Sequence, residues 1–202
     1  MAKRPATQRT RILNAAMELA AEHGWRDLTL GQIAAAAKVS LAQLHANFPA
    51  HTKILIGLME RADAEVLENI EPAAASEPVH DRLMDAVMRR LDALAPYKPG
   101  IKAVLRDLAS DPVAALAMAP ACFNAMAWML ESGGIGSAGP GGRLRIRGLA
   151  LIYLSTLCVW VRDESQDMGA TLSHLDRRLR QAGRLVSFLP RGRSRHAAAA
   201  ES

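Results

Sequence analysis

The chain has 202 residues, enough for one large domain or two small ones, and a formal net charge of +5. It contains 38 Ala and 26 Leu against 24 Val, Ile and Thr together, and this balance favours helices over strands. The composition therefore predicts an all-α protein and excludes a sandwich, a barrel or a parallel-sheet enzyme. Cys122 and Cys158 lack the spacing of a zinc site, so we expect free thiols and no metal.

Charge is distributed unevenly along the chain. Residues 1–55 carry a net +4, residues 56–140 a net −5 and residues 141–202 a net +6. A basic N-terminal segment followed by an acidic one indicates an anion-binding module joined to a second unit, although ordinary surface variation gives the same pattern. The first ten residues are basic and polar and lack the apolar stretch of a secretory signal, so we expect a cytoplasmic protein.

The N-terminal part predicts one longer helix followed by two short ones. Residues 10–23 repeat apolar side chains at helical spacing, and a glycine follows as a stop signal. Thr29 with Gln32, and Ser40 with Gln43, each form a capping-box pattern at the start of a short helix. Three residues separate the two short helices, so only a tight turn fits between them.

The rest of the chain predicts further helices, about nine in all. They cover residues 52–70, 78–94, 101–109, 112–118, 121–131, 143–162 and 170–188, with a flexible loop at 132–142 and a disordered tail at 191–202. The uncharged run 112–130 is largely Ala and contains Pro120. We interpret it as buried helices of a soluble protein, broken at Pro120, and expect no membrane span.

Two short helices joined by a tight turn, at about 30–49, predict a helix-turn-helix that binds DNA. Residues 41–48 form the candidate recognition helix. The side chains expected to face the core are Ile33, Val39, Leu44 and Phe48.

Outward positions of this recognition helix can contact bases and phosphates. Gln43 suits adenine edges, small apolar side chains suit the thymine methyl group, and Ser40 can bond a phosphate. The candidate contacts, with their flanking basic residues, are Arg9, Arg11, Lys38, Ser40, Leu41, Ala42, Gln43, His45, Ala46, Asn47 and Lys53. A three-helix hairpin without a ligand is the alternative.

Residues 7–67 resemble the N-terminal domain of TetR-family transcriptional regulators. The matching stretches are RILNAAMELAAEHGWRDLTLGQIAAAAKVSLAQLHANF and PAHTKIL. The resemblance implies a homodimer with one helix-turn-helix per subunit, each reading half of an operator. It also implies that residues 68–190 bind a small effector and carry the dimer interface. With this resemblance in view, Thr29 and His51 join the candidate DNA contacts.

Three positions depart from the family pattern. Lys38 stands in the turn where the family has Gly and a left-handed backbone is often needed, at a cost of about 1 kcal/mol. His45 replaces a phosphate-contacting Tyr, and His51 replaces a Lys at the start of the fourth helix. These departures weaken the expected grip on phosphate.

A second stretch, IYLSTLCVWVRDESQDMGATLSHLDRRLRQA, resembles the end of the ubiquinone-biosynthesis accessory proteins that share the TetR fold. This resemblance implies an alternative function, a lipid- or quinone-binding accessory protein with little DNA binding. The basic N-terminal segment and the recognition-helix pattern favour the regulator.

Methionines and aromatics in the C-terminal part predict an adaptable apolar pocket for a hydrophobic effector, with plain core packing as the alternative. The candidate ligand-binding residues are Met84, Met88, Leu105, Met118, Phe123, Met126, Met129, Tyr153 and Trp160.

Apolar stripes on the last two helices predict a four-helix dimer interface, with burial inside one subunit as the alternative. The stripes are Leu149, Ile152, Tyr153, Thr156, Val159 and Trp160, and then Leu172, Leu175, Leu179, Ala182, Leu185, Val186 and Leu189. We expect Arg177, Arg178, Arg180 and Arg184 to form a solvated basic face.

An enzyme is not expected, because no histidine stands at metal-binding spacing and no nucleophile has a recognisable base; no cofactor is expected either. We expect Asp163, Glu164 and Asp167 to cap helices. The predicted function is a DNA-binding regulator, a repressor released from a palindromic operator by a small hydrophobic effector that tilts the fourth helix.

Overall fold

The computed structural model describes residues 7–68 and 77–187, with side chains to residue 184, and in these residues every regular element is a helix. The elements are α1 (Gln8–His23), α2 (Leu30–Ala36), α3 (Leu41–Asn47), α4 (His51–Glu68), α5 (Val79–Leu94), the 3-10 helix η1 (Ala95–Tyr97), α6 (Lys98–Leu108), α7 (Pro112–Ser132), α8 (Gly139–Trp160) and α9 (Gly169–Ser187). The predicted all-α fold of about nine helices is confirmed. The tail at 191–202 lies outside the described residues.

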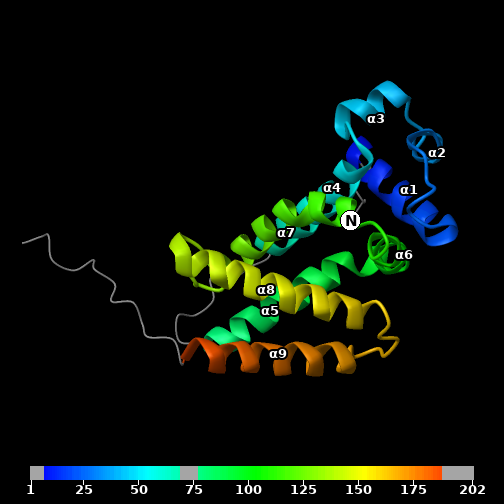
Figure 1. Cartoon of the computed structure of the whole chain (residues 1–202). Coiled ribbons are helices and arrows are strands. Elements are labelled where there is room, and N and C mark those ends of the chain that lie inside the picture. Colours follow the sequence, from blue (N-terminus) through cyan, green and yellow to red (C-terminus); the bar gives the residue numbers. More distant parts are fainter. Residues whose placement is uncertain (1–6, 69–76, 188–202) are drawn as a thin grey trace, which may run out of the picture.

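The helices form two groups that α4 joins (Figure 1). Helices α1, α2 and α3 make the N-terminal group, and α3 lies at the end of the molecule farthest from α9. In the C-terminal group, α7 packs on α4 and α8, and α9 packs on α5 and α8. One continuous cluster of buried apolar residues runs through both groups.

Helix α6 connects the two groups a second time, by lying directly on α1. At Gly100 the α6 backbone comes so close to the carbonyl oxygen of Met17 that a Cβ would have no room. A glycine is therefore required at this crossing by the close approach of two backbones.

The predicted break at Pro120 is wrong, because α7 continues through this residue. It runs without interruption from Pro112 to Ser132, with Pro120 inside it. Proline forfeits one backbone hydrogen bond in a helix interior. Here an Asp111 cap at the start and buried residues in the second half, such as Met126, hold both sides of the proline in one helix.

Two boundaries also differ from the prediction. Helix α6 begins at Lys98 rather than at residue 101, because Pro99 occupies its first turn, where a proline is well tolerated. Helix α8 begins at Gly139, so the glycine-rich loop is shorter than residues 132–142.

Much of α7 is exposed although the helix is strongly apolar. It is the one helix of the described residues long and apolar enough to cross a membrane, with a mean hydropathy of 1.6, yet only 28% of that window is buried. Exposed apolar residues recur three or seven positions apart on α7 and again on α8, and Trp128 follows five positions after the last of those on α7. We call them the α7–α8 stripes: Val113, Leu116, Phe123 and Trp128, and then Leu144, Leu151 and Leu154.

The predicted dimer stripe of α8 lies inside the subunit. Tyr153, Thr156 and Trp160 are buried against neighbouring helices, Leu149 is buried too, and Ile152 and Val159 are half-buried. On α9, Leu175 and Leu179 are buried while Leu172 and Ala182 are half-buried. Leu189 and the side chains of Leu185 and Val186 lie outside the description. Six residues of the two stripes therefore pack within one chain, and the dimer interface itself stays a prediction.

Candidate nucleic-acid interface and effector core

Both short helices of the N-terminal group begin with the predicted capping boxes. Thr29 Oγ1 accepts from Gln32 N at 3.2 Å, and Gln32 Oε1 accepts from Thr29 N at 2.8 Å. Ser40 Oγ accepts from Gln43 N at 3.1 Å, and Gln43 Oε1 accepts from Ser40 N at 2.9 Å. A bidentate contact with adenine needs both Oε1 and Nε2 of a glutamine, so Gln43 would have to leave its cap to make one.

The turn between α2 and α3 contains a left-handed residue. Lys38 has φ 54°, and the backbone N–H of Val39 bonds to the carbonyl of Ala34 at 3.0 Å. Only Gly adopts this conformation without a steric penalty. The turn therefore has the shape expected at this position, but with a residue that strains it.

Helix α3 divides into an inner and an outer face as predicted. Leu44 and Phe48 are buried, together with Ile33 of α2, and Val39 is half-buried. Asn47 is also half-buried, and its Nδ2 donates to the carbonyl of Gln43 at 2.8 Å. The exposed residues of the outer face are Leu41, Ala42, Gln43, His45 and Ala46.

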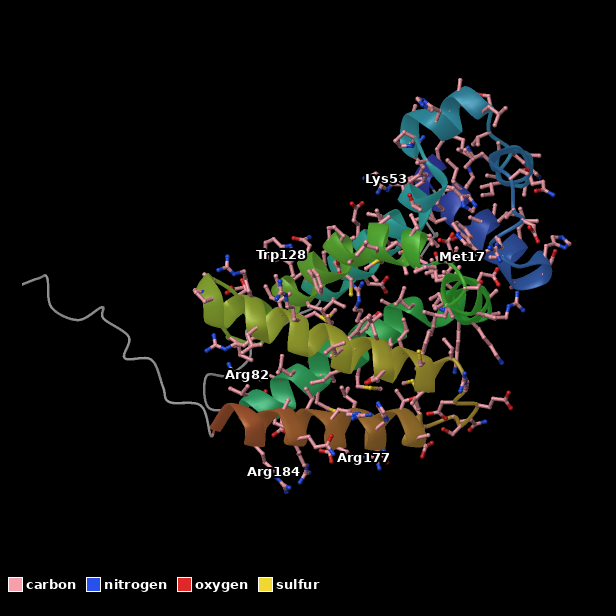
Figure 2. The ribbon with its side chains drawn as sticks, viewed as in Figure 1. Met17, Lys53, Arg82, Trp128, Arg177 and Arg184 are labelled. Carbon is pink, nitrogen blue, oxygen red and sulfur yellow. The ribbon has the colours of Figure 1, made fainter. Side chains whose placement is uncertain are left out.

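The basic residues flanking α3 differ in what they contact. Arg11, Lys38 and Lys53 are exposed, and Lys53 lies near the start of α4 (Figure 2). Arg9, in contrast, pairs with Glu60 at 2.6 Å and lies over the Phe48 ring at 4.8 Å from its centroid. Arg9 thus fastens α1 to α3 and α4 in this structure.

His51 is turned toward the interior at the start of α4. Its ring stacks on Trp25 with centroids 4.0 Å apart and an interplanar angle of 18°. Burial lowers the pKa of His51, and its buried Nε2 has no hydrogen-bond partner among the described residues. The ring is therefore held neutral and connects the α1–α2 loop to α4.

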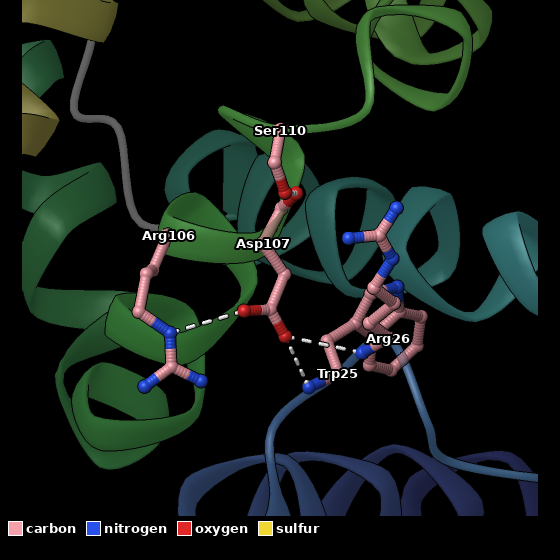
Figure 3. Close-up of polar contacts among 5 residues, drawn as sticks. All are labelled: Trp25, Arg26, Arg106, Asp107 and Ser110. Atoms are coloured by element: carbon pink, nitrogen blue, oxygen red, sulfur yellow. Dashed lines mark hydrogen bonds and ion pairs between the residues drawn. The ribbon is translucent and has the colours of Figure 1, made fainter.

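Asp107 of α6 binds the same loop (Figure 3). Its Oδ2 accepts from the backbone N–H of Trp25 at 2.7 Å and of Arg26 at 3.1 Å, while Oδ1 accepts from Arg106 Nε at 3.0 Å. These bonds lower the pKa of the Asp107 carboxyl against the opposing effect of burial. The C-terminal group therefore holds the N-terminal group by a carboxylate as well as by packing.

Asp163 caps the start of α9, as predicted for this acidic segment. Its Oδ2 accepts from Thr171 N at 2.9 Å and from Thr171 Oγ1 at 2.7 Å, and its Oδ1 accepts from Ser165. The hydroxyl bonds from Ser165 and Thr171 hold the pKa of Asp163 far below its usual range.

Four of the predicted effector residues lie in the hydrophobic core, and their role in binding an effector stays a prediction. Of these residues, Met126, Met129, Tyr153 and Trp160 are buried, Phe123 is exposed, and Met84, Met88, Leu105 and Met118 are half-buried. A cleft between α4 and α7 has a volume of about 10 Å³, enough for about one water molecule. Its lining residues are Asp63, Val66, Leu67, Trp128, Met129 and Ser132.

Sequence reasoning missed one charged residue in this core. Arg90 of α5 is fully buried, forms an ion pair with Asp63 of α4, and lies over the Tyr153 ring at 5.3 Å from its centroid. The signal was present in the sequence, because Arg90 occupies the apolar stripe of its helix between Val87 and Leu94.

Comparisons with family models match both ends of the chain. Residues 12–56 match the model described as bacterial regulatory proteins, tetR family, and residues 145–186 match the COQ9 model. Both predicted resemblances are confirmed. No curated protein sequence matches the chain.

Solved structures of TetR regulators share the whole fold. A TetR transcriptional regulator from Nitrosomonas europaea ATCC 19718 is 27% identical over 87% of this chain and 97% of that chain, with a TM-score of 0.69. One from Rhodococcus sp. RHA1 is 19% identical over 86% and 94%, with a TM-score of 0.61. NalD, described as the secondary repressor of the MexAB-OprM multidrug efflux pump in Pseudomonas aeruginosa, is 21% identical over 86% and 96%, with a TM-score of 0.52. The chain therefore has the fold of TetR-family transcriptional regulators, which supports a DNA-binding regulator.

Proposed function

We propose that this chain is a cytoplasmic repressor that binds a palindromic operator as a homodimer and is released by a small hydrophobic effector. The observation that carries the proposal is the outer face of α3, which is exposed at one end of the molecule between Lys38 and Lys53. A helix of this kind enters the major groove, while flanking cations neutralise phosphates.

The effector would release the protein from DNA through α4. This helix begins four residues after α3 ends, and Gly57 packs against Phe48, the residue that follows α3. Farther along α4, Asp63 forms an ion pair with Arg90, which is buried among the predicted effector residues. A dimer suited to DNA holds its two recognition helices about 34–36 Å apart. An effector that favours another tilt of α4 would change this spacing and weaken binding.

Selection of bound sequences from random duplex DNA tests the operator. Enrichment of a palindrome with half-sites about 10 base pairs apart is expected, and absence of any enriched sequence would contradict the proposal. Gln43→Ala should relax base preference, whereas Gln32→Ala, which removes the same capping bond from α2, should not. Lys53→Ala should weaken binding to all DNA sequences. It should also reduce the slope of the logarithm of the binding constant against the logarithm of salt concentration by about 1.

A second candidate function is lipid or quinone binding with little DNA binding. The match of residues 145–186 to the COQ9 model favours it, together with the exposed α7–α8 stripes. Lipid that co-purifies with the chain, in the absence of operator enrichment, would support this function over the repressor.

A further inference from the structure

We propose that Arg90 is the anchor for the acidic head of the effector, and that the effector is an apolar molecule with a single carboxylate. The inference rests on the proposed function, because it names the ligand class for that regulator. Three observations support it: the Arg90 guanidinium is buried with unpaired hydrogen-bond donors, its surroundings are apolar, and its ion-pair partner Asp63 belongs to α4.

Arg90 has donors without partners. Its side chain is fully buried, and Nη1 donates to Asp63 and lies 3.5 Å from the carbonyl oxygen of Met59. Nε and Nη2 are buried and have no hydrogen-bond partner among the described residues. Buried donors of a charged group are normally satisfied, so two on one residue indicate a missing acceptor.

The two unused donors select the kind of acceptor. Nε and Nη2 lie on the same edge of the guanidinium plane and direct two parallel N–H bonds outward. A carboxylate matches this edge with two parallel hydrogen bonds, in the bidentate geometry that makes arginine–carboxylate pairs strong. One carboxylate would therefore satisfy both donors.

Charge limits the acid to a single negative charge. The Arg90–Asp63 pair is neutral as it stands, and the Asp63 side chain is 15% exposed, so Asp63 can turn toward solvent. A carboxylate on Arg90 then replaces the charge of Asp63 and keeps the core neutral. A doubly charged phosphate would leave a net negative charge buried, which is strongly unfavourable.

The surroundings of Arg90 are suited to an aliphatic or aromatic tail. The guanidinium lies over the Tyr153 ring. Burial raises the pKa of the Cys122 thiol, and the positive charge of Arg90 opposes this effect only in part. Buried Met126 and Met129 contribute to the same core, and methionine side chains repack easily around a ligand. The small cleft between α4 and α7 is lined by Asp63 and Trp128, so it reaches one partner of the ion pair.

Anchoring the acid at Arg90 would couple the ligand to α4. In the closed core Arg90 of α5 holds α4 through Asp63. A ligand carboxylate on Nε and Nη2 leaves the Nη1 donor to Asp63, but it places a second negative charge beside one guanidinium. Repulsion between the two carboxylates then favours a state in which Asp63, and with it α4, has moved away from Arg90. The ligand thus binds the released position of α4 better than the held one, as any effector must.

Isothermal titration of the full chain with dodecanoate, dodecanol and dodecyl phosphate tests the anchor. Dodecanoate should bind at least about tenfold more tightly than either of the other two, since it alone makes two charge-assisted bonds without adding a second charge. Equal affinities for the acid and the alcohol, tighter binding of the phosphate, or no binding of dodecanoate at millimolar concentration would each overturn the proposal.

Variants separate the anchor from general packing. Arg90→Met should lose about tenfold or more in dodecanoate affinity and leave dodecanol unchanged. Arg89→Met, on the exposed side of the same helix, should change neither. Asp63→Asn should bind dodecanoate more tightly than the unmodified chain, because the competing negative charge is gone. Equal or weaker binding would contradict the proposal, and this test remains available if Arg90→Met fails to fold.

The operator selection is independent of this test. Arg90-dependent binding of dodecanoate without operator enrichment would support the anchor and contradict the repressor. Operator enrichment with no preference for the acid would support the repressor and overturn the anchor.

Discussion

Lys38 is the residue at which the backbone of the helix-turn-helix is most strained, since it adopts φ 54° where a side chain is unfavourable. Lys38→Gly should raise the free energy of unfolding by about 0.5 kcal/mol, because glycine avoids the left-handed penalty but loses more backbone entropy on folding. Urea denaturation measures this change. Lys38→Ala is the matched control: it removes the same charge but keeps the penalty, so an equal gain in both variants would exclude backbone strain as the cause.

His51 predicts a pH effect of known sign. Burial lowers its pKa in the folded state, so the unfolded chain binds more protons as the pH falls below about 6.5. The stability that depends on a neutral His51 is therefore present above that pH and is lost on acidification toward the folded pKa. His51→Phe keeps a ring beside Trp25 but cannot titrate. Denaturation at pH 7.5 and 5.5 should give this variant a smaller loss of stability, and an unchanged loss would contradict the assignment.

Single residues show where sequence reasoning succeeds and where it fails. The capping pairs at Thr29 and Ser40 could be predicted because both partners lie within one turn of helix. Arg9 and His51 have partners far away in the sequence, Glu60 and Trp25, and no local pattern specifies such contacts. Arg90 is different: its position in the apolar stripe of α5 could be read from the sequence, whereas its partner Asp63 belongs to another helix and could not.

Among the helices, α9 depends most clearly on one cap. Asp163→Ala removes the acceptor of four hydrogen bonds from Ser165 and Thr171 and should destabilise the chain by about 2 kcal/mol. Because the pKa of Asp163 is lowered on folding, its stabilisation is present above about pH 4 and is lost as the pH falls further. Thermal unfolding at pH 7 measures the loss, and Glu164→Ala, exposed beside it, is the control that should leave the midpoint unchanged.

Helix α7 explains why boundaries were harder to predict than helices. The rule that proline ends a helix is local, and it predicted two helices where one is formed. Packing of the second half against α4 and α8 outweighs the lost hydrogen bond, and that packing depends on the whole fold. The identities of the helices, in contrast, follow from apolar spacing within each one.

At the scale of the whole molecule, the α7–α8 stripes are the feature that a single subunit leaves unexplained. Leu151 is 71% exposed and Leu116 is 74% exposed, on helices whose opposite sides are packed in the core. Large exposed apolar patches typically mark interaction sites. Two adjacent helices from each subunit would form a four-helix interface about a two-fold axis, in which each stripe meets its copy.

Leu151→Glu tests this interface, because the two-fold axis introduces a charge twice into an apolar contact. We expect the dissociation constant of the dimer to rise about a hundredfold, so that light scattering detects a monomer at micromolar concentration. Affinity for a selected operator should fall with it, since a monomer presents only one α3. Gln181→Glu places the same charge on the exposed side of α9 and should leave both the dimer and the operator affinity intact. A Leu151→Glu variant that stays dimeric would contradict an interface formed by α7 and α8.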